Sequence, residues 1–414
     1  MSKQLKIGLF GFGVVGQGLY DILHKTESFK AEIVKICVKN REKNRSIEPE
    51  RFTFDKNDIL ENPEINLIVE LINNADEAYE IVTRALKKGK TVVTANKKML
   101  AEHLEEFVEL QKKYNASLLY EASVCGSIPI IRNLEEYYDN ELLYSLNGIV
   151  NGTSNYILSK IFNENLDYDK ALRQAQDLGF AETNPIADVG GFDALNKLCI
   201  LVAHSYGTFV KPDEMFNYGI QSLSSYDIQF AKEKGYKIKL VAQVYKTGES
   251  KITAFVVPQF IKPGDYLFNI ENEYNGVTVE AAFADKQFFM GKGAGGHPTG
   301  SAVLSDISAS RYEYRYEYKK LSHDKNIQYV PDNLIEIYLR YHDEKDIQLL
   351  DFDNITERYE SRNFHYVIGT VRLNHLIEHK DELSKRNLFL ANTGRKVIHE
   401  SVKIKQQLLE DVSA

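Results

Sequence analysis

The first 130 residues alternate short apolar runs with amphipathic segments. The apolar runs are predicted strands, and they lie at 5–10, 31–38, 65–72, 91–95 and 117–121. Between them, apolar residues recur at helical spacing, which predicts helices over 17–24, 77–88 and 99–114. Strands and helices that alternate with short links are typical of an α/β fold with a parallel, doubly wound sheet.

The pattern changes after residue 130. Predicted helices come first and predicted strands follow, over 153–162, 168–178, 191–206, 237–247, 251–257 and 266–271. We interpret residues 131–290 as a separate α+β domain. The glycine-rich stretch 291–299 precedes a predicted helix over 300–311, and we expect the segment of about 291–320 to return to the first domain.

The last ninety residues, 325–414, are more polar than the rest of the chain. Strands are predicted over 334–341 and 366–373, and a helix near 374–384. These elements predict a small C-terminal α+β appendage.

Composition and charge narrow the class of protein. The chain has 414 residues, of which 43% are hydrophobic and 27% charged, as expected for a globular protein of two or three domains. The formal net charge of −8 argues against a general nucleic-acid binder. Three scattered cysteines, Cys37, Cys125 and Cys199, are too few for a disulfide framework or a Cys-rich zinc site. Without an apolar run of membrane-span length or a signal-peptide pattern, we expect a cytoplasmic protein with no membrane partner.

A Gly-x-Gly-x-x-Gly turn directly follows the first predicted strand. Its glycines would allow a tight turn, a close approach of the backbone to a pyrophosphate, and close helix–strand packing. A plain glycine turn is the alternative, but the place of the motif at the start of a βαβ unit favours a Rossmann-type dinucleotide site. The predicted cofactor-binding residues are Gly11, Phe12, Gly13, Val14, Val15 and Gly16.

The end of the second strand indicates which dinucleotide binds. An NAD site usually has an acidic residue there for the ribose hydroxyls, but this chain has Lys39 and Arg41 near the tip. Both side chains could meet a 2′-phosphate, so we predict NADP in preference to NAD, with NAD still possible. A solvated charged loop would explain either side chain equally well.

Five ordered blocks carry a resemblance to the homoserine dehydrogenases over roughly residues 5–315. The blocks are the glycine turn 11–16, then 91–97 (TVVTANK), 120–130 (YEASVCGSIPI), 148–158 (GIVNGTSNYIL) and 178–198. The resemblance implies a nicotinamide-dependent interconversion of L-homoserine and L-aspartate 4-semialdehyde, a step toward threonine and methionine. Asn73–Asn74 and Ser127 depart from the family, which usually has glycines there.

Two lysines are the candidate catalytic cations. Lys97 follows the end of a strand, where ligands bind in open α/β sheets, so it could meet oxygens of substrate or cofactor, as could Thr94. Asp193 and Lys197 lie four residues apart on one helix face. An ordinary ion pair would explain that spacing, but the resemblance makes Lys197 the proton donor and Asp193 a substrate ligand.

The resemblance also assigns the loop before that helix. It gives Glu182 to the homoserine amino group and Asp188 to the active-site network, although helix capping or solvation would also explain these residues. Asn151 and Thr153 could contact a ligand or merely form their turn. Gly295 could return to the cofactor, because a second glycine-rich turn before a helix suits a close approach. His204 is expected to be a core histidine.

The resemblance further implies a monovalent cation, sodium or potassium, bound by oxygens of Glu121, Val124, Gly126 and Ile128. Alkali cations take carbonyl and carboxylate oxygens, so side-chain identity matters little; an ordinary loop without an ion is the alternative.

The family also suggests a homodimer through the region flanking 131–150. The C-terminal residues have roughly the length of a βαββαβ ACT-type sensor, and we expect a degenerate version of it.

Two other functions remain open at this point. A different small-aldehyde or amino-acid oxidoreductase could use the same scaffold, because a fold alone does not fix a substrate. A nucleotide-binding protein without activity is the second alternative. The presence of Lys97, Glu182, Asp193 and Lys197 argues against it.

Overall fold

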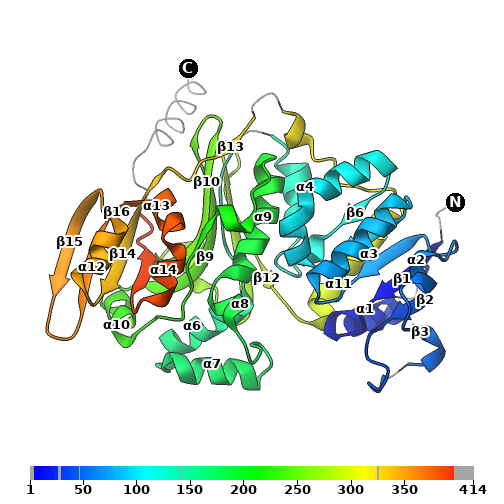
Figure 1. The fold of residues 1–414 in the computed structure, drawn as a ribbon, viewed down its shortest axis with the longest axis horizontal. Helices are drawn as coiled ribbons and strands as arrows, with labels where there is room; N and C mark the ends of the chain where they lie inside the picture. Colours follow the sequence, from blue (N-terminus) through cyan, green and yellow to red (C-terminus); the bar gives the residue numbers. More distant parts are fainter. Residues whose placement is uncertain (1–3, 27–28, 46, 141, 324–325, 396–414) are drawn as a thin grey trace. The chain divides into compact units, whose positions relative to one another are not determined.

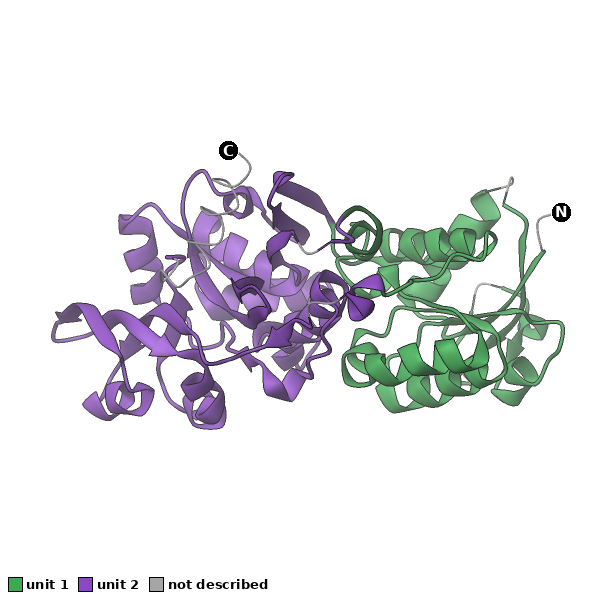
Figure 2. Cartoon of the chain, turned by 90° about the horizontal axis from the view of Figure 1, so that it is seen from above, with its two compact units in different colours: residues 1–137, 292–318 green, residues 138–291, 319–414 purple. Residues whose placement is uncertain are grey.

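The computed structural model describes residues 4–26, 29–45, 47–140, 142–323 and 326–395. The chain forms two compact units (Figure 2). Unit 1 contains residues 1–137 and 292–318, and unit 2 contains residues 138–291 and 319–414. None of the described helices is long and apolar enough to cross a membrane. The predicted boundary of a separate domain at 325–414 stays a prediction.

Unit 1 is built on a six-stranded parallel sheet in the order β3-β2-β1-β4-β5-β6. Figure 1 labels β1, β2, β3 and β6 of this sheet. The strands are β1 (Leu5–Phe10), β2 (Ala31–Cys37), β3 (Phe52–Thr53), β4 (Leu67–Glu70), β5 (Thr91–Thr94) and β6 (Leu118–Leu119). The helices are α1 (Val14–Lys25), α2 (Asn57–Leu60), α3 (Ala75–Lys87), α4 (Lys97–Tyr114), α5 (Ile130–Arg132) and α11 (Gly296–Ser310). Short turns are η1 (Pro49–Arg51), η2 (Glu121–Ser123) and the π-helical η3 (Asn133–Tyr137). This topology confirms the predicted doubly wound α/β sheet.

The order of the strands fixes where a ligand can bind in unit 1. The chain winds outward from β1 to β3 and then returns to the other side of β1 at β4. A crevice therefore opens at the carboxyl ends of β1 and β4, the usual ligand site of such sheets. Asn74 and Asn96 start the helices after β4 and β5, because each side chain accepts a bond from a backbone amide of the first turn.

Close contact between α1 and α11 explains part of the glycine-rich stretch. A Cβ atom on Gly18 would lie 2.2 Å from the carbonyl oxygen of Gly296, and one on Gly300 would lie 2.9 Å from the amide nitrogen of Leu19. Only glycines allow the two helix backbones to approach this closely. α11 begins four residues before the predicted start at Gly300.

Unit 2 is built on a mixed sheet in the order β12-β11-β7-β9-β10-β17-β14-β16-β15, with β8 and β13 also paired to β10. Its first strands are β7 (Leu143–Ile149), β8 (Phe216–Asn217), β9 (Lys237–Gly248), β10 (Lys251–Ile261), β11 (Tyr274–Ala281) and β12 (Asp285–Lys292). The helices around them are α6 (Gly152–Glu164), α7 (Tyr168–Asp177), α8 (Ile186–Val189), α9 (Phe192–Tyr206) and α10 (Ser225–Glu233), with turns η4 (Pro212–Glu214) and η6 (Lys319–Ser322). The apolar helix α9 lies against β9 and β10.

The strand predicted at 266–271 is wrong. Residues Tyr266–Asn269 form a 3₁₀ turn, η5, because the Asp265 side chain accepts a 2.8 Å bond from the amide of Leu267 and starts a helical turn. The strand β11 begins only at Tyr274.

The C-terminal elements of unit 2 extend the same sheet. They are β13 (Gln328–Tyr329), β14 (Leu334–Tyr341), α12 (Glu344–Leu350), β15 (Asn354–Glu360), β16 (His365–Arg372), α13 (Leu373–Glu378), α14 (Lys380–Lys385) and β17 (Phe389–Asn392). β17 pairs with β14 on one side and with β10 on the other. A buried ion pair between Arg340 and Asp227, with Nε 3.0 Å from Oδ2, joins β14 to α10.

Candidate active site

The glycine turn of unit 1 has a separate spatial reason for each glycine. Gly11 has a φ of +92°, and a Cβ on it would lie 2.6 Å from the carbonyl oxygen of Leu71. A Cβ on Gly16 would lie 2.5 Å from the carbonyl oxygen of Gly11. Gly13 has no atom within 4 Å of its Cβ position among the described residues, so its face is open to a ligand. This is the geometry by which such a turn brings backbone amides and a helix N-terminus to a pyrophosphate.

The start of α11 adds a second helix N-terminus beside this turn. A Cβ on Gly296 would lie 2.9 Å from the carbonyl oxygen of Val14 at the start of α1. Gly295 caps α11 with a φ of +117°, a conformation that favours glycine. Two helix N-termini at one place strengthen the attraction for an anion.

A groove of about 710 Å³ runs from the glycine turn along the carboxyl ends of β1, β2 and β4. It is lined by basic side chains together with two acidic ones, Lys39, Arg41, Lys43, Arg45, Lys56, Asp55 and Glu77. Lys39 forms an exposed ion pair with Glu77, with Nζ 2.6 Å from Oε2. The Arg41 guanidinium lies 4.6 Å from the ring centre of Phe54. The groove therefore presents an ion-paired lysine and a stacked arginine beside an anion-binding turn.

Glu70 ties together the two loops that end β4 and β5. Its carboxylate accepts a 2.6 Å bond from the amide of Ile72 and a 2.5 Å bond from the hydroxyl of Thr94. Asn96 closes the network, because its amide nitrogen Nδ2 donates to the carbonyl oxygen of Ile72 at 3.1 Å. Burial raises the pKa of the Glu70 carboxyl to about 7.

Lys97 is the first residue of α4, directly after this network. Its backbone amide donates to the carbonyl oxygen of Ala95 at 3.0 Å, and its side chain is half-buried. Thr94 uses its only hydroxyl proton on Glu70, so toward a ligand it could only accept a bond. The bonds of Glu70 and Asn96 therefore fix the position of the loop after β5, and with it the start of α4 at Lys97.

The loop at 121–128 surrounds another buried carboxylate. Glu121 accepts bonds from the amides of Ile131 and Arg132 at 2.8 and 3.0 Å. Burial, with the neighbouring carboxylate of Asp306, raises the pKa of Glu121 to about 8. Ser127 occupies the place of the usual family glycine, and its amide and hydroxyl both donate to the carbonyl oxygen of Lys292.

Unit 2 gathers an amide, two carboxylates and a lysine. The side-chain amide of Asn151 donates to Asp188 Oδ1 at 2.7 Å and to Asp193 Oδ2 at 2.8 Å. Lys197 Nζ lies 2.7 Å from the same Asp193 oxygen and donates to the carbonyl oxygen of Val150 at 2.7 Å. Asp193 and Lys197 are only 6% and 7% exposed. A buried ion pair with each partner hydrogen-bonded is a suitable place for an ammonium group and a transferable proton.

Local structure aligns this cluster. Asn151 is the N-cap of α6, because its Oδ1 accepts a 2.8 Å bond from the amide of Ser154, and its Nδ2 is thereby directed at the carboxylates. Gly191, with a φ of +80°, starts α9 and lets Asp193 and Lys197 follow one turn apart on one face. The predicted i, i+4 pair is thus a real contact.

Glu182 lies on the loop after α7, and Thr153, on α6, contacts the same loop. Glu182 is exposed on the loop after α7, and its backbone carbonyl accepts a 3.1 Å bond from Gln176. The hydroxyl of Thr153 donates to the carbonyl oxygen of Phe180 at 2.6 Å, so this residue holds the loop that carries Glu182. His204 is fully buried on α9, as expected for a core histidine.

Comparison with known proteins gives consistent matches. A family model described as the NAD binding domain of homoserine dehydrogenase matches residues 11–121, and one described as homoserine dehydrogenase matches residues 129–308. The chain is 32% identical to the homoserine dehydrogenase of Bacillus subtilis over 374 residues, which is 87% of this chain and 86% of that protein. The chain belongs to the homoserine dehydrogenase family.

Solved structures of homoserine dehydrogenases agree with the fold. A crystal structure from Thiobacillus denitrificans matches with a TM-score of 0.80 at 29% identity, covering 94% of this chain and 98% of that one. A hyperthermophilic archaeal homoserine dehydrogenase in complex with NADPH matches with a TM-score of 0.66 at 27% identity, covering 76% of this chain and 99% of that one.

Homoserine dehydrogenase membership fixes the class of reaction. The chain is an oxidoreductase that acts on a CH–OH group of a small molecule with a nicotinamide cofactor, in threonine and methionine biosynthesis. The resemblance seen in the five sequence blocks is confirmed. Membership also removes the alternatives of a different oxidoreductase and of an inactive nucleotide-binding protein.

Two residues of the site were missed or undervalued from sequence. Asn151 bridges both carboxylates, a role that depends on α6, α8 and α9 meeting in space. Glu70 had a visible signal, because it is the one acidic residue within the apolar run 65–72. A buried acid in such a run needs partners, and these partners are the ends of the neighbouring loops.

Proposed function

We propose that the chain interconverts L-homoserine and L-aspartate 4-semialdehyde with NADP in preference to NAD, and that Lys197 exchanges the proton. The observation that carries the proposal is the buried cluster in unit 2, where Lys197 contacts Asp193 and Asn151 joins Asp193 to Asp188. A positive group next to the reacting oxygen and negative groups for the substrate ammonium are what this chemistry needs.

Lys197 has the geometry of a proton donor. An ammonium has three N–H groups, and two of them are directed at Asp193 and at the carbonyl oxygen of Val150. The third can donate to the carbonyl oxygen of the semialdehyde, which becomes the homoserine hydroxyl when the proton moves. In the oxidation direction, the neutral amine of Lys197 takes the proton back from the hydroxyl.

The carboxylates hold the substrate in place. Asp193 would bind the substrate while its contact with Lys197 orients that lysine. Asp188 adds a second carboxylate through Asn151, and Glu182, from the exposed loop, adds a third. Lys97 supplies a cation for the carboxylate of the substrate or an oxygen of the cofactor.

A nicotinamide cofactor supplies or accepts the hydride when it is bound. The residues that fit it are the open face at Gly13, the N-termini of α1 and α11 with Gly295, and the side chains of Lys39 and Arg41 for the 2′-phosphate. Phe12, Val14 and Val15 complete the backbone of the turn, and Thr94, at the end of β5, is a further proposed contact. An exposed Arg41 and Lys39, with no acidic residue at the end of β2, support the preference for NADP.

We also propose a monovalent cation, sodium or potassium, held by oxygens of Glu121, Val124, Gly126 and Ile128. Two consecutive left-handed residues, Cys125 and Gly126, with φ values of +57° and +53°, bend this loop tightly. The buried carboxylates of Glu121 and Asp306 support the proposal, because a cation there would stabilise their ionised forms.

Two further proposals concern assembly and regulation. We propose a homodimer through the region flanking 131–150; Tyr137 in that region is 59% exposed.

We propose that the C-terminal elements form a degenerate ACT-type sensor. Their order β14-α12-β15-β16-α13/α14-β17 is βαββαβ apart from the divided second helix, and their sheet order β17-β14-β16-β15 is fully antiparallel. Light scattering tests the first proposal, and inhibition by threonine tests the second.

The experiment that tests the proposed reaction is the absorbance at 340 nm of purified protein with L-homoserine and NADP⁺, then with NAD⁺. It is run in potassium buffer and repeated with a bulky organic cation in place of potassium. We expect a rise that depends on homoserine and is faster with NADP⁺. A rise that is equal with NAD⁺ would contradict the cofactor preference, and the absence of any rise would contradict the reaction.

A further inference from the structure

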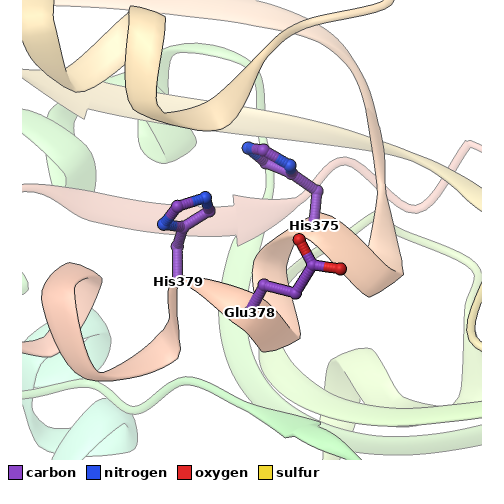
Figure 3. A group of neighbouring side chains, drawn as sticks. All are labelled: His375, Glu378 and His379. Atoms are coloured by element: carbon purple, nitrogen blue, oxygen red, sulfur yellow. The ribbon is translucent and has the colours of Figure 1, made fainter.

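Two histidines and a glutamate gather at the end of α13, outside the site described above. The sequence His375-Leu-Ile-Glu378-His379 puts the two histidines four residues apart, and hence on one side of the helix. One ligand atom of each of the three side chains lies within 4.8 Å of the others. Figure 3 shows the two imidazole rings side by side and the Glu378 carboxylate close to His375. The ring centres are 4.5 Å apart.

The orientation of His375 is fixed by a backbone partner. Its Nε2 lies 2.7 Å from the carbonyl oxygen of Leu349, on α12. A carbonyl can only accept, so Nε2 carries the hydrogen and Nδ1 of the neutral ring has a free lone pair. Metal-binding histidines are typically held in this way, with the second ring nitrogen donating to a backbone carbonyl.

We propose that His375, Glu378 and His379 bind a divalent transition-metal ion of the zinc class. Two imidazoles and one carboxylate match the nitrogen and oxygen ligands of zinc, whereas magnesium and calcium prefer oxygen alone. Three protein ligands leave a fourth position for water. In a tetrahedral site the ligand atoms lie about 3.3 Å apart, so rotation of the side chains closes the present gaps.

The surroundings favour a cation at this place. Glu378 is exposed and both histidines are half-buried, so an ion can enter from solvent. The carboxylate of Glu382 lies 3.9 Å from Nδ1 of His379 and adds negative charge. Lys380, which follows His379 in the sequence, donates to the carbonyl oxygen of Met215 at 3.5 Å. Glu382 is itself neutralised in part by Arg386.

The proposed site lies at the junction of two short helices, which a single residue separates. His379 ends α13 and precedes α14, and its amide donates to the carbonyl oxygen of His375 at 3.2 Å. An ion bound by two residues of α13 and by His379 at the junction would stabilise the folded protein by mass action. The inference does not depend on the proposed reaction.

The test uses full-length, tag-free protein that has been freed of metal with a chelator and then titrated with zinc by calorimetry. We expect one ion per chain, and we expect His379→Ala to weaken the affinity at least about 100-fold, since even outer-shell changes cost 10- to 100-fold. His342→Ala is the matched control in the same unit and should bind as the parent does. Glu378→Gln should weaken binding without disturbing the His375 contact to Leu349.

Two further readouts separate this site from others. Cobalt should give the visible absorption of nitrogen and oxygen ligation without a thiolate band, which excludes binding at Cys37. Zinc should raise the Tm of the parent and of His342→Ala but not that of His379→Ala. A parent protein that binds no ion, or a His379→Ala variant that binds as tightly as the parent, would overturn the proposal.

Discussion

Unit 1 and unit 2 prepare their proposed ligand sites in different ways. In unit 1 the anion-binding elements are backbone amides, helix N-termini and exposed cations on the groove beside the glycine turn. In unit 2 the proposed substrate-binding elements are buried side chains, and a single Asp193 oxygen contacts both Lys197 and Asn151. A site made of backbone and solvated charges tolerates substitution, whereas a buried charge network loses function when one atom is removed.

The departures from the family fit this contrast. Asn73–Asn74 and Ser127 all lie in unit 1, where the usual residues are glycines. Asn74 caps α3 by accepting a 2.8 Å bond from the amide of Glu77, and Ser127 gains bonds to Lys292. Asn74 and Ser127 each form a local bond, and none of the three residues changes a charged group.

The largest expected effect comes from Lys197→Met. The change removes the proposed proton donor, and general acid–base catalysis typically contributes 10²- to 10⁴-fold, so we expect kcat to fall about 1,000-fold. The measurement is steady-state turnover at saturating NADP⁺ and homoserine. Lys160→Met, on the surface of α6 beside Glu164, is the control and should keep full activity. Retention of more than a tenth of the turnover by Lys197→Met would contradict the proposed role.

Asn151→Ala should have the next largest effect. It removes two bonds to carboxylates, each worth about 1.5–3 kcal/mol. A loss of about 3 kcal/mol, the lower end of their sum, would lower kcat/KM for homoserine roughly 100-fold. The loss of the α6 N-cap should also lower stability by about 1 kcal/mol. Asn163→Ala, at the other end of α6, is the control. Unchanged kinetics for homoserine would show that catalysis does not require the bonds from Asn151 to Asp188 and Asp193.

Arg41→Ala should have a smaller and more selective effect in unit 1. An exposed cation beside a 2′-phosphate is screened by solvent, so we expect kcat/KM for NADPH to fall about tenfold. NADH lacks this phosphate and serves as the internal control, with an unchanged value. Equal losses with both cofactors would argue that Arg41 acts on the shape of the groove and not on the phosphate.

Glu70→Gln should change the pH dependence of stability more than the activity. Because the pKa of Glu70 is raised to about 7 in the folded protein, the fold binds this proton more tightly than the unfolded chain does. The resulting stabilisation is complete below about pH 4 and is lost as the pH rises through 7, by up to about 3 kcal/mol. Glutamine keeps an acceptor for Ile72 but does not ionise, so the free energy of unfolding should decline less between pH 5 and 8.

Denaturant unfolding at several pH values measures this decline. Glu105→Gln, on the exposed face of α4, is the control and should behave as the parent does. Equal pH slopes in Glu70→Gln and the parent would mean that Glu70 is ionised throughout. Glu121 and Asp306 also make the free energy of unfolding decline as the pH rises. The contribution of Glu70 is therefore the difference in pH slope between the parent and Glu70→Gln.

The two units also differ in how well sequence predicted them. The strands of unit 1 are mostly apolar because both faces of a parallel sheet are covered, and all five predicted strands are present. The two-residue strand β3 was missed. In unit 2 the strands β7 and β11 were missed, since each contains an Asn-Gly pair that favours a turn. Both pairs lie within paired strands, with Gly276 opposite Ile149 and Gly148 opposite Val277, so tertiary packing overrides the local preference.

The same distinction holds for the site residues. Gly11, Gly13 and Gly16 could be predicted because a fixed local spacing creates their geometry, and Asp193 with Lys197 because they share one helix face. The bridge through Asn151 and the closure of two loops by Glu70 could not, because each joins segments that only the fold brings together.

The most direct test of the contrast between the units is a crossed measurement on Lys197→Met and Arg41→Ala. The Kd for NADPH is measured by fluorescence titration, and kcat at saturating cofactor by absorbance. We expect Lys197→Met to lose kcat and keep the parent Kd, and Arg41→Ala to lose affinity and keep the parent kcat. A loss of NADPH affinity in Lys197→Met, or of kcat in Arg41→Ala, would contradict this expectation.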